Sequence, residues 1–163
     1  MKNFKLLLSG RLFLALVVAT LFASGVAEAQ SAVPFKATIA ITELIQPSTD
    51  PLCFREGHIS GTGLVTHLGK VTLDSIDCIT PNETAFSFIS DQLVITVVAN
   101  GDQIFASYSG IFRIEGPVGV ISGGYQIVGG TGRYSQARGE GAVQGVEDIT
   151  GQGSVELTGT ISY

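Results

Sequence analysis

Apolar and polar residues alternate with a period of two along most of the chain after residue 30. In residues 34–44, Phe35, Ala37, Ile39 and Ile41 fall on one face and polar residues fall between them. Residues 153–163 alternate just as regularly. This period is typical of β-strands with one buried face, and no comparable run with helical spacing of three and four is found there. The pattern predicts an all-β fold.

Gly, Pro, Asn and Asp divide this pattern into eight short segments. The predicted strands lie near residues 34–44, 58–68, 70–78, 84–99, 103–114, 119–129, 139–146 and 153–163. The segment 84–99 is long, and we expect it to bend near Asp91. Asn100–Gly101 between two apolar runs is a strong hairpin signal. Eight antiparallel strands with short turns can close into a barrel or form a two-sheet sandwich.

Glycines inside the predicted strands favour the barrel over the sandwich. They are Gly61, Gly63, Gly141, Gly145 and Gly159. A glycine weakens a flat strand, but it suits a strongly curved strand or a place where a cavity needs room. We therefore predict an eight-stranded antiparallel β-barrel.

The glycine-rich stretch of residues 127–141 sits between two of these strands. A phosphate-binding loop would need a helix after the glycines, and here strand alternation returns within a few residues. The stretch is better interpreted as a sharp turn at residues 129–132 followed by one helical turn at residues 134–137. We expect Tyr134 to close one end of the barrel.

The first residues have the pattern of an export signal. Lys2, Lys5 and Arg11 precede an apolar run that is too short to span a bilayer, and Ala27 and Ala29 form an A-x-A cleavage site. We predict a cleaved signal peptide at residues 1–29 and a single domain at residues 30–163; an uncleaved anchor is the alternative. The expected location is secreted or periplasmic.

The charge of the mature chain argues against two classes of partner. Residues 1–29 hold three of the nine basic and one of the fourteen acidic residues, so a net charge of −7 remains after cleavage. Nucleic acids and anionic lipid surfaces are bound mainly through Lys and Arg. We therefore expect no nucleic-acid partner and, after signal cleavage, no membrane partner.

Cys53 and Cys78 are the only cysteines. In an exported protein such a pair usually forms a disulfide, which we expect here; free thiols or a metal site are the alternatives. His58 and His67 are the only histidines, so the chain offers few further ligands for a metal site, and we predict no metal. Asn82 begins an N-glycosylation sequon, which matters only in a eukaryotic host.

The segment "VGGTGRYSQARGEGAVQG", residues 128–145, resembles the signature of plant dirigent proteins and, more loosely, a turn of allene oxide cyclases. The resemblance implies an eight-stranded barrel, often trimeric, with a cavity and no cofactor. Dirigent proteins orient phenoxy radicals during coupling, and allene oxide cyclases orient an epoxide. The resemblance also implies that Arg138 contributes to the pocket, although strict alternation places Arg138 on the outer face.

Alternation predicts a set of inward-facing polar side chains that could line such a pocket. The candidates are His67, Asp77, Tyr108 and Tyr125. The simpler interpretations are a strand end for Asp77, solvent exposure for His67 and ordinary core packing for the tyrosines. Glu147 and Asp148 are expected to be solvated in a turn.

Two hypotheses for function follow, and the sequence leaves open whether the protein is an enzyme. The first is a cofactor-free pocket that binds or orients a small apolar molecule, as an isomerase or a stereo-controlling auxiliary. The second is a non-catalytic structural or interaction protein with a filled barrel. An internal void lined by at least two polar groups would distinguish the first from the second.

Overall fold

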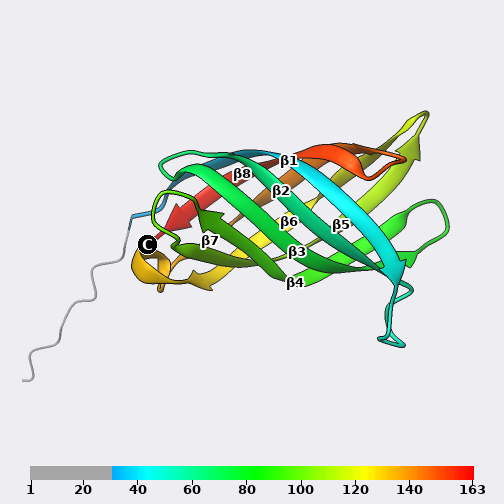
Figure 1. Cartoon of the computed structure of the whole chain (residues 1–163), viewed down its shortest axis with the longest axis horizontal. Coiled ribbons are helices and arrows are strands. Elements are labelled where there is room, and N and C mark those ends of the chain that lie inside the picture. The colour runs from blue at the N-terminus through cyan, green and yellow to red at the C-terminus, as the bar shows by residue number, and fades with distance from the viewer. Residues whose placement is uncertain (1–30) are drawn as a thin grey trace, which may run out of the picture.

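The computed structural model describes residues 31–163, so the predicted signal peptide at residues 1–29 lies outside the described residues. Eight strands follow one another along the chain (Figure 1). Their bounds are β1 Val33–Pro47, β2 Arg55–Val65, β3 Gly69–Pro81, β4 Phe86–Val97, β5 Gln103–Glu115, β6 Val118–Gly130, β7 Arg138–Asp148 and β8 Gln152–Ser162. No helix in this part of the chain is long and apolar enough to cross a membrane.

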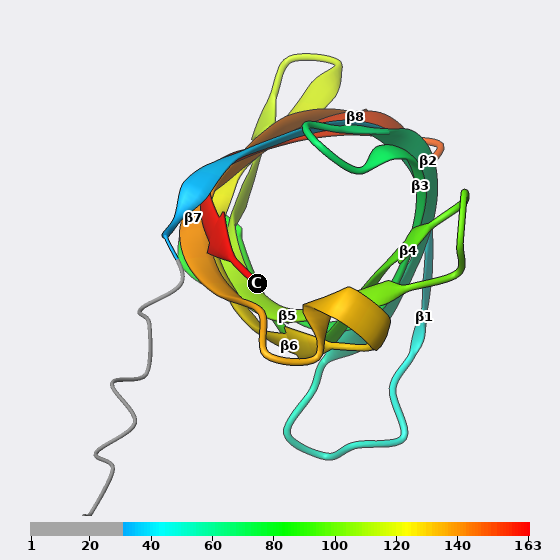
Figure 2. The ribbon, with the colours of Figure 1, turned by 90° about the vertical axis from the view of Figure 1, so that its left-hand side faces the viewer.

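The strands form one closed barrel in sequence order, and every neighbouring pair is antiparallel (Figure 2). Closure comes from β1, which pairs with β2 on one side and with β8 on the other. In the pairing of β1 with β8, the aligned residues run from Val33 opposite Ile161 to Thr42 opposite Gln152. The predicted barrel is therefore confirmed, and the sandwich is excluded.

Glycines in β2 allow β1 to approach closely. A Cβ atom added at Gly61 would lie 2.9 Å from a side-chain carbon of Ile39 and 2.8 Å from the carbonyl oxygen of Ala40. At Gly63 it would lie 2.7 Å from the Ile39 Cα. These contacts are shorter than van der Waals packing allows, so larger residues would force the two strands apart.

The predicted bend in the fourth strand is also present. The register of β4 against β5 shifts between Ser90 and Leu93, which leaves Asp91 and Gln92 outside the regular ladder. A second shift lies on the other side of the same strand, between Asp74 and Cys78 of β3. Bulges of this kind bend a strand and increase its twist, which helps a sheet to close.

The glycine-rich stretch forms the corner between β6 and β7. It contains a short 3-10 helix, η1, at Gly132–Tyr134, which begins earlier than the predicted turn at residues 134–137. Gly132 has φ +54°, a left-handed conformation that glycine adopts without strain. Tyr134 is fully buried, and its ring meets the ring of Tyr163 edge-on at 4.9 Å. Tyr134 thus closes this end of the barrel, as predicted.

The half of the barrel next to this corner is solid. The largest fully buried side chains are Phe35, Ile39, Val71, Ile95, Val97, Ile104, Tyr134 and Ile161. They cluster in one hydrophobic core, and the end they fill is the one that carries the C-terminus (Figures 1 and 2). The opposite end is formed by the loops at residues 48–54, 82–85, 116–117 and 149–151.

A disulfide joins Cys53 to Cys78, which confirms the predicted pair. Cys53 lies in the loop between β1 and β2, and Cys78 lies on β3, with the two Cα atoms 5.3 Å apart. The bond therefore fixes this long loop to the wall of the barrel at its open end.

Replacing Tyr134, which closes one end of the barrel, should lower the free energy of unfolding strongly. We expect Tyr134→Ala to lower the free energy of unfolding by about 3 to 5 kcal/mol, because it removes a fully buried aromatic ring. Tyr134→Phe is the matched control and should cost little, since the Tyr134 hydroxyl has no hydrogen-bond partner in the part of the chain that the structure describes. Urea unfolding followed by circular dichroism measures both. Equal losses in the two variants would contradict the packing role.

Candidate functional site

The open half of the barrel holds a cavity of about 600 Å³. Its wall is mostly apolar, because the alternation that fills the closed half continues here with aliphatic and aromatic residues. The apolar lining includes Ile41, Ile59, Leu73, Ile79, Phe86, Phe88, Leu93, Phe112, Ile121, Val143, Val155 and Leu157. The barrel is therefore not filled along its whole length, which favours the first of the two functional hypotheses.

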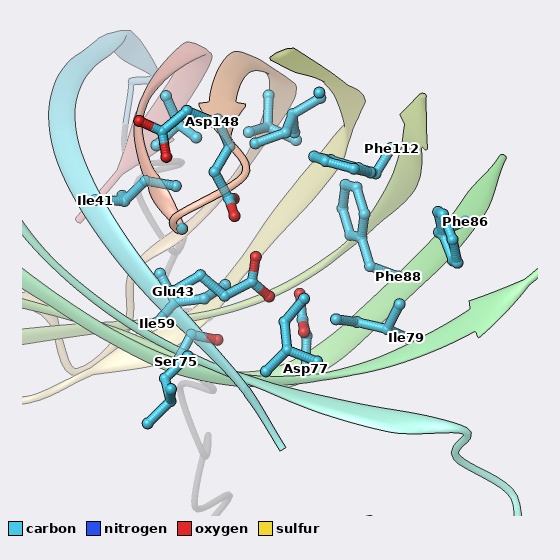
Figure 3. A pocket seen from close by; sticks show the side chains of 18 of the residues that line it. Ile41, Glu43, Ile59, Ser75, Asp77, Ile79, Phe86, Phe88, Phe112 and Asp148 are labelled. Carbon is cyan, nitrogen blue, oxygen red and sulfur yellow. The ribbon is translucent and has the colours of Figure 1, made fainter. Parts of the chain in front are cut away.

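Three carboxyl groups converge on this cavity. Glu43 comes from β1, Asp77 from β3 and Glu147 from β7. Asp77 and Glu147 are each only 5% exposed, and Glu43 is half-buried. Figure 3 shows the carboxyl groups of Glu43 and Asp77 close to each other.

Two glycines make room for these carboxyls on the strands between them. Gly57 on β2 pairs with Asp77, and a Cβ atom added at Gly57 would collide with carboxylate oxygens of both Glu43 and Asp77. Gly153 on β8 pairs with Glu147, and a Cβ atom there would lie 2.9 Å from the Glu147 Cα. Acidic residues and glycines thus alternate over the five adjacent strands β7, β8, β1, β2 and β3.

A hydrogen-bonded group of hydroxyls lies on the far side of Asp77. The Tyr108 hydroxyl donates to Oδ2 of Asp77 at 3.2 Å. Ser75 Oγ lies 3.0 Å from the Tyr108 hydroxyl and 3.2 Å from Ser90 Oγ. The other carboxylate oxygen of Asp77, Oδ1, is buried and has no hydrogen-bond partner among the described residues.

The surroundings raise the pKa of each carboxyl. Burial, followed by the charge of Glu43, raises the pKa of Asp77 to about 7. Burial and the neighbouring Glu147 raise the pKa of Glu43 to about 8, and burial also raises the pKa of Glu147. Glu43 and Glu147 are within hydrogen-bonding reach, so the pair can share a proton. At neutral pH the cluster therefore holds protons that isolated carboxyls would have released.

Tyr125 lies deeper, on β6. It is 4% exposed, and its ring packs against Phe35 with the ring centroids 5.9 Å apart. Tyr125 is among the residues that line the cavity, its hydroxyl is buried without a hydrogen-bond partner within residues 31–163, and burial raises its pKa to about 12. Cβ atoms added at Gly141 and Gly159 would lie 2.6 and 2.7 Å from this hydroxyl. Two of the strand glycines thus provide the space that the tyrosine occupies.

The structure brings together three of the five residues that the sequence placed in a pocket. Asp77, Tyr108 and Tyr125 all line the cavity. His67 does not, which corrects its expected inward orientation. β2 ends at Val65, and His67 lies exposed in the following turn with φ +64°, where the strand alternation no longer applies.

Arg138 is also outside the cavity, on the outer face that strict alternation predicted. It is exposed, and its guanidinium donates hydrogen bonds to the carbonyl oxygens of Val128 and Ala137, both at 2.7 Å. The pocket role implied by the resemblance is therefore corrected. In this chain Arg138 stabilises the corner between β6 and β7.

Two acidic residues of the site were missed in the sequence. Glu147 was expected to be solvated, but β7 extends to Asp148 and turns Glu147 inward, while Asp148 stays exposed as predicted. Val143 and Gly145 share the face of Glu147, so continued alternation was the available signal. Glu43 likewise continues the face of Phe35 and Ile41.

Among the described residues, these carboxyls form no ion pair with a basic side chain and have no metal-binding geometry. Within residues 31–163 the one ion pair joins His58 and Glu56 at 3.5 Å, and it does not involve the cluster. Over the same range, no group of three or more His, Cys, Asp or Glu side chains is arranged to hold a metal ion. The cluster is thus a set of acids in an apolar cavity.

Comparison with known proteins identifies the fold. No protein-family model matches the sequence, and no curated protein is similar to it in sequence. Among solved structures, the chain is similar to a pterocarpan synthase dirigent protein, with a TM-score of 0.53 and 14% identity over 82% of this chain and 86% of that chain. The barrel therefore has the fold of a dirigent protein, as the resemblance of residues 128–145 implied.

The acid cluster should make the protein less stable as pH rises. Because their pKa values are raised by folding, Glu43, Asp77 and Glu147 keep protons that the unfolded chain releases above about pH 5. The unfolding free energy should fall between about pH 5 and pH 8. One fully shifted group lowers the unfolding free energy by up to about 1.4 kcal/mol for each pH unit. The half-buried Glu43 contributes less to this fall because solvent screens it.

Chemical unfolding at several pH values measures how steeply the unfolding free energy changes with pH, and we call this dependence the slope. Glu43→Gln and Asp77→Asn should each flatten it and should be more stable than the wild type at pH 8. Glu140→Gln, an exposed carboxyl on β7, is the control and should leave the slope unchanged. A stability that rises with pH over this window would show that the carboxyls are ionised and satisfied in the folded protein.

Proposed function

We propose that this protein binds a small, mainly apolar molecule in its barrel and holds it in one orientation against the acid cluster. The observation that carries the proposal is the cavity of about 600 Å³, with apolar walls and polar groups gathered on β1, β3, β5 and β7. Ligand pockets commonly have volumes of roughly 300–1,000 Å³ and a few well-placed polar groups in an apolar lining.

The solid half of the barrel supports this role. A packed core beneath the cavity keeps the wall strands in place, so the side chains that meet the ligand are preorganised. Apolar side chains ring the mouth: Ile45, Phe54, Ile114 and Ile149 are exposed, and all four line the entrance. An apolar ligand can enter along these side chains, which share the rim with Arg55 and Asp148.

The chemistry we propose needs no cofactor. Near neutral pH a carboxyl with the raised pKa of Asp77 can donate a proton to a ligand oxygen or accept one from it. Holding a reactive molecule in one geometry supplies a further part of the rate or the stereochemical control. The similarity to a pterocarpan synthase dirigent protein supports an orienting role of this kind.

We also propose that the protein works outside the cytosol. The disulfide between Cys53 and Cys78 supports an oxidising compartment, where such bonds persist. The signal peptide and the trimer implied by the resemblance stay predictions.

Binding of a neutral apolar dye tests the cavity. N-phenyl-1-naphthylamine should bind the wild type saturably with a rise in fluorescence. Ile121→Trp fills the cavity from β6 and should weaken binding about tenfold or more, since the added ring occupies the ligand's space. Val128→Trp, on the outer face of the same strand, is the matched control and should bind like the wild type.

A wild type that shows no saturable dye binding would contradict the pocket and favour an interaction protein. Equal binding by Ile121→Trp and the wild type would place the dye outside the barrel.

Tyr125→Phe should affect ligand binding more than it affects stability. The hydroxyl has no hydrogen-bond partner within residues 31–163, so its loss should change the unfolding free energy by less than about 1 kcal/mol. Binding of 2-naphthol, whose hydroxyl can pair with Tyr125, should weaken severalfold, while binding of naphthalene should not change. Calorimetry measures both quantities. An unchanged 2-naphthol affinity would remove Tyr125 from the site.

A further inference from the structure

We propose that the cavity selects ligands that carry a positively charged amine, and that Glu43, Asp77 and Glu147 together form the binding site for this amine. The inference rests on the proposed function, because it names the class of molecule that the same cavity takes. The cavity alone requires only a small, apolar ligand. The acid cluster adds the requirement that this ligand carry a positive charge.

The unpartnered oxygen of Asp77 is the first observation. Asp77 is 5% exposed and lines the cavity, and its Oδ1 atom has no hydrogen-bond partner among the described residues. Burying a polar group without a partner costs free energy, and the cost is greater for a charged group. An N–H donor on a ligand would satisfy this oxygen, and an ammonium group offers three such donors.

The charges around the cluster are the second observation. From β1, β3 and β7 the groups that face it are acidic, and from β5 the group is the Tyr108 hydroxyl. His58 on β2 acts on Asp77 through its charge but is paired with Glu56 outside the cavity. At the rim, Asp148 is exposed and the Arg55 guanidinium lies over the Phe54 ring, 5.4 Å from its centre.

Among the described residues, no basic side chain forms an ion pair with any of the three acids. Such a site attracts a ligand cation and repels a carboxylate or phosphate, since like charges in an apolar setting cost several kcal/mol.

Aromatic rings complete the environment of an ammonium group. Phe86 and Phe112 lie 6.4 Å apart between ring centres, and Phe88 and Tyr108 lie 5.9 Å apart. Figure 3 shows Phe86, Phe88 and Phe112 on the side of the cavity away from Glu43. Cations are attracted to aromatic faces, and the rings also contact the hydrocarbon part of an amine.

An organic amine fits the site better than a metal ion. The cluster lacks metal-binding geometry within the described residues, and the space beside it is far larger than an ion needs. The carboxyls also lie on one side of an apolar chamber, so a ligand with one cationic end and one apolar end would fill both parts.

Binding of such a ligand should release protons. Without the ligand, Glu43 and Asp77 retain protons near neutral pH because their pKa values are raised. A bound ammonium group replaces these protons as the hydrogen-bond donor between the carboxyls. Affinity for the amine should therefore increase from about pH 6 to about pH 8, as the carboxyls ionise more easily. Above that range the carboxyls have lost their protons, and the affinity should level off.

Three ligands with the same ring system test the proposal. 1-Naphthylmethylamine, 1-naphthylmethanol and 1-naphthoate differ mainly in charge, and each is titrated against bound N-phenyl-1-naphthylamine at pH 7.5. We expect the amine to bind about tenfold more tightly than the alcohol, and the carboxylate to bind most weakly. Calorimetry of the amine in phosphate and in Tris should show a heat difference that corresponds to proton release.

Charge-removing variants assign the effect to the cluster. Asp77→Asn and Glu147→Gln should each reduce the preference for the amine over the alcohol about fivefold to tenfold, with little change for the alcohol itself. Glu140→Gln removes an exposed carboxyl from the same strand as Glu147 and should keep the preference of the wild type. The alcohol also reports whether each variant is folded with its cavity intact.

The outcomes separate this inference from the proposed function. If the alcohol binds as tightly as the amine, or if the preference survives in Asp77→Asn and Glu147→Gln, the inference is wrong and the cavity proposal stands. If neither the dye nor any naphthyl compound binds, both are wrong. The same observed heat of amine binding in phosphate and in Tris, without correction for buffer ionisation, would overturn the exchange of protons for an ammonium group.

Discussion

The pairing of β1 with β8 is the constraint on which the rest of this structure depends. It leaves no free strand edge, and it turns eight one-sided strands into one shared interior. Residues far apart in the sequence meet only because of this closure. Glu147 on β7 and Glu43 on β1 lie close together because β8 joins their strands and contributes Gly153 between them. An open sheet would place these two carboxyls at opposite edges.

Closure fixes the width of the interior, and the side chains then decide how much of it is filled. In one half, large residues such as Tyr134 and Phe35 are fully buried in the hydrophobic core. In the other half, glycines such as Gly57 and Gly153 replace larger residues, and the carboxyls of Glu43 and Asp77 lie against Gly57. One fold thus provides a rigid base and a chamber, which is the division that a binding site on a stable scaffold requires.

Strand alternation predicted the fold and much of the site, because both depend on a period of two that can be read locally. Asp77, Tyr108 and Tyr125 were found in this way, and Arg138 was correctly placed outside by the same rule. Errors occurred where a strand ends. β2 stops before His67, and β7 continues through Glu147, and neither boundary follows from composition alone. The cluster itself could not be predicted, since it requires the register of five strands and the closure of the barrel.

The burial of three carboxyl groups in the cavity lowers the stability of the protein. Three carboxyls in an apolar chamber, without an ion pair to a basic side chain of the described residues, lower the stability of the empty protein above neutral pH. Hydrophobic residues of similar size would pack there at no such cost, as they do in the closed half. The glycines beneath Glu43 and Asp77 also show that the backbone is adapted to hold the acids together, because a Cβ atom at Gly57 would separate them. Local instability of this kind is found where a protein must bind or react rather than only fold.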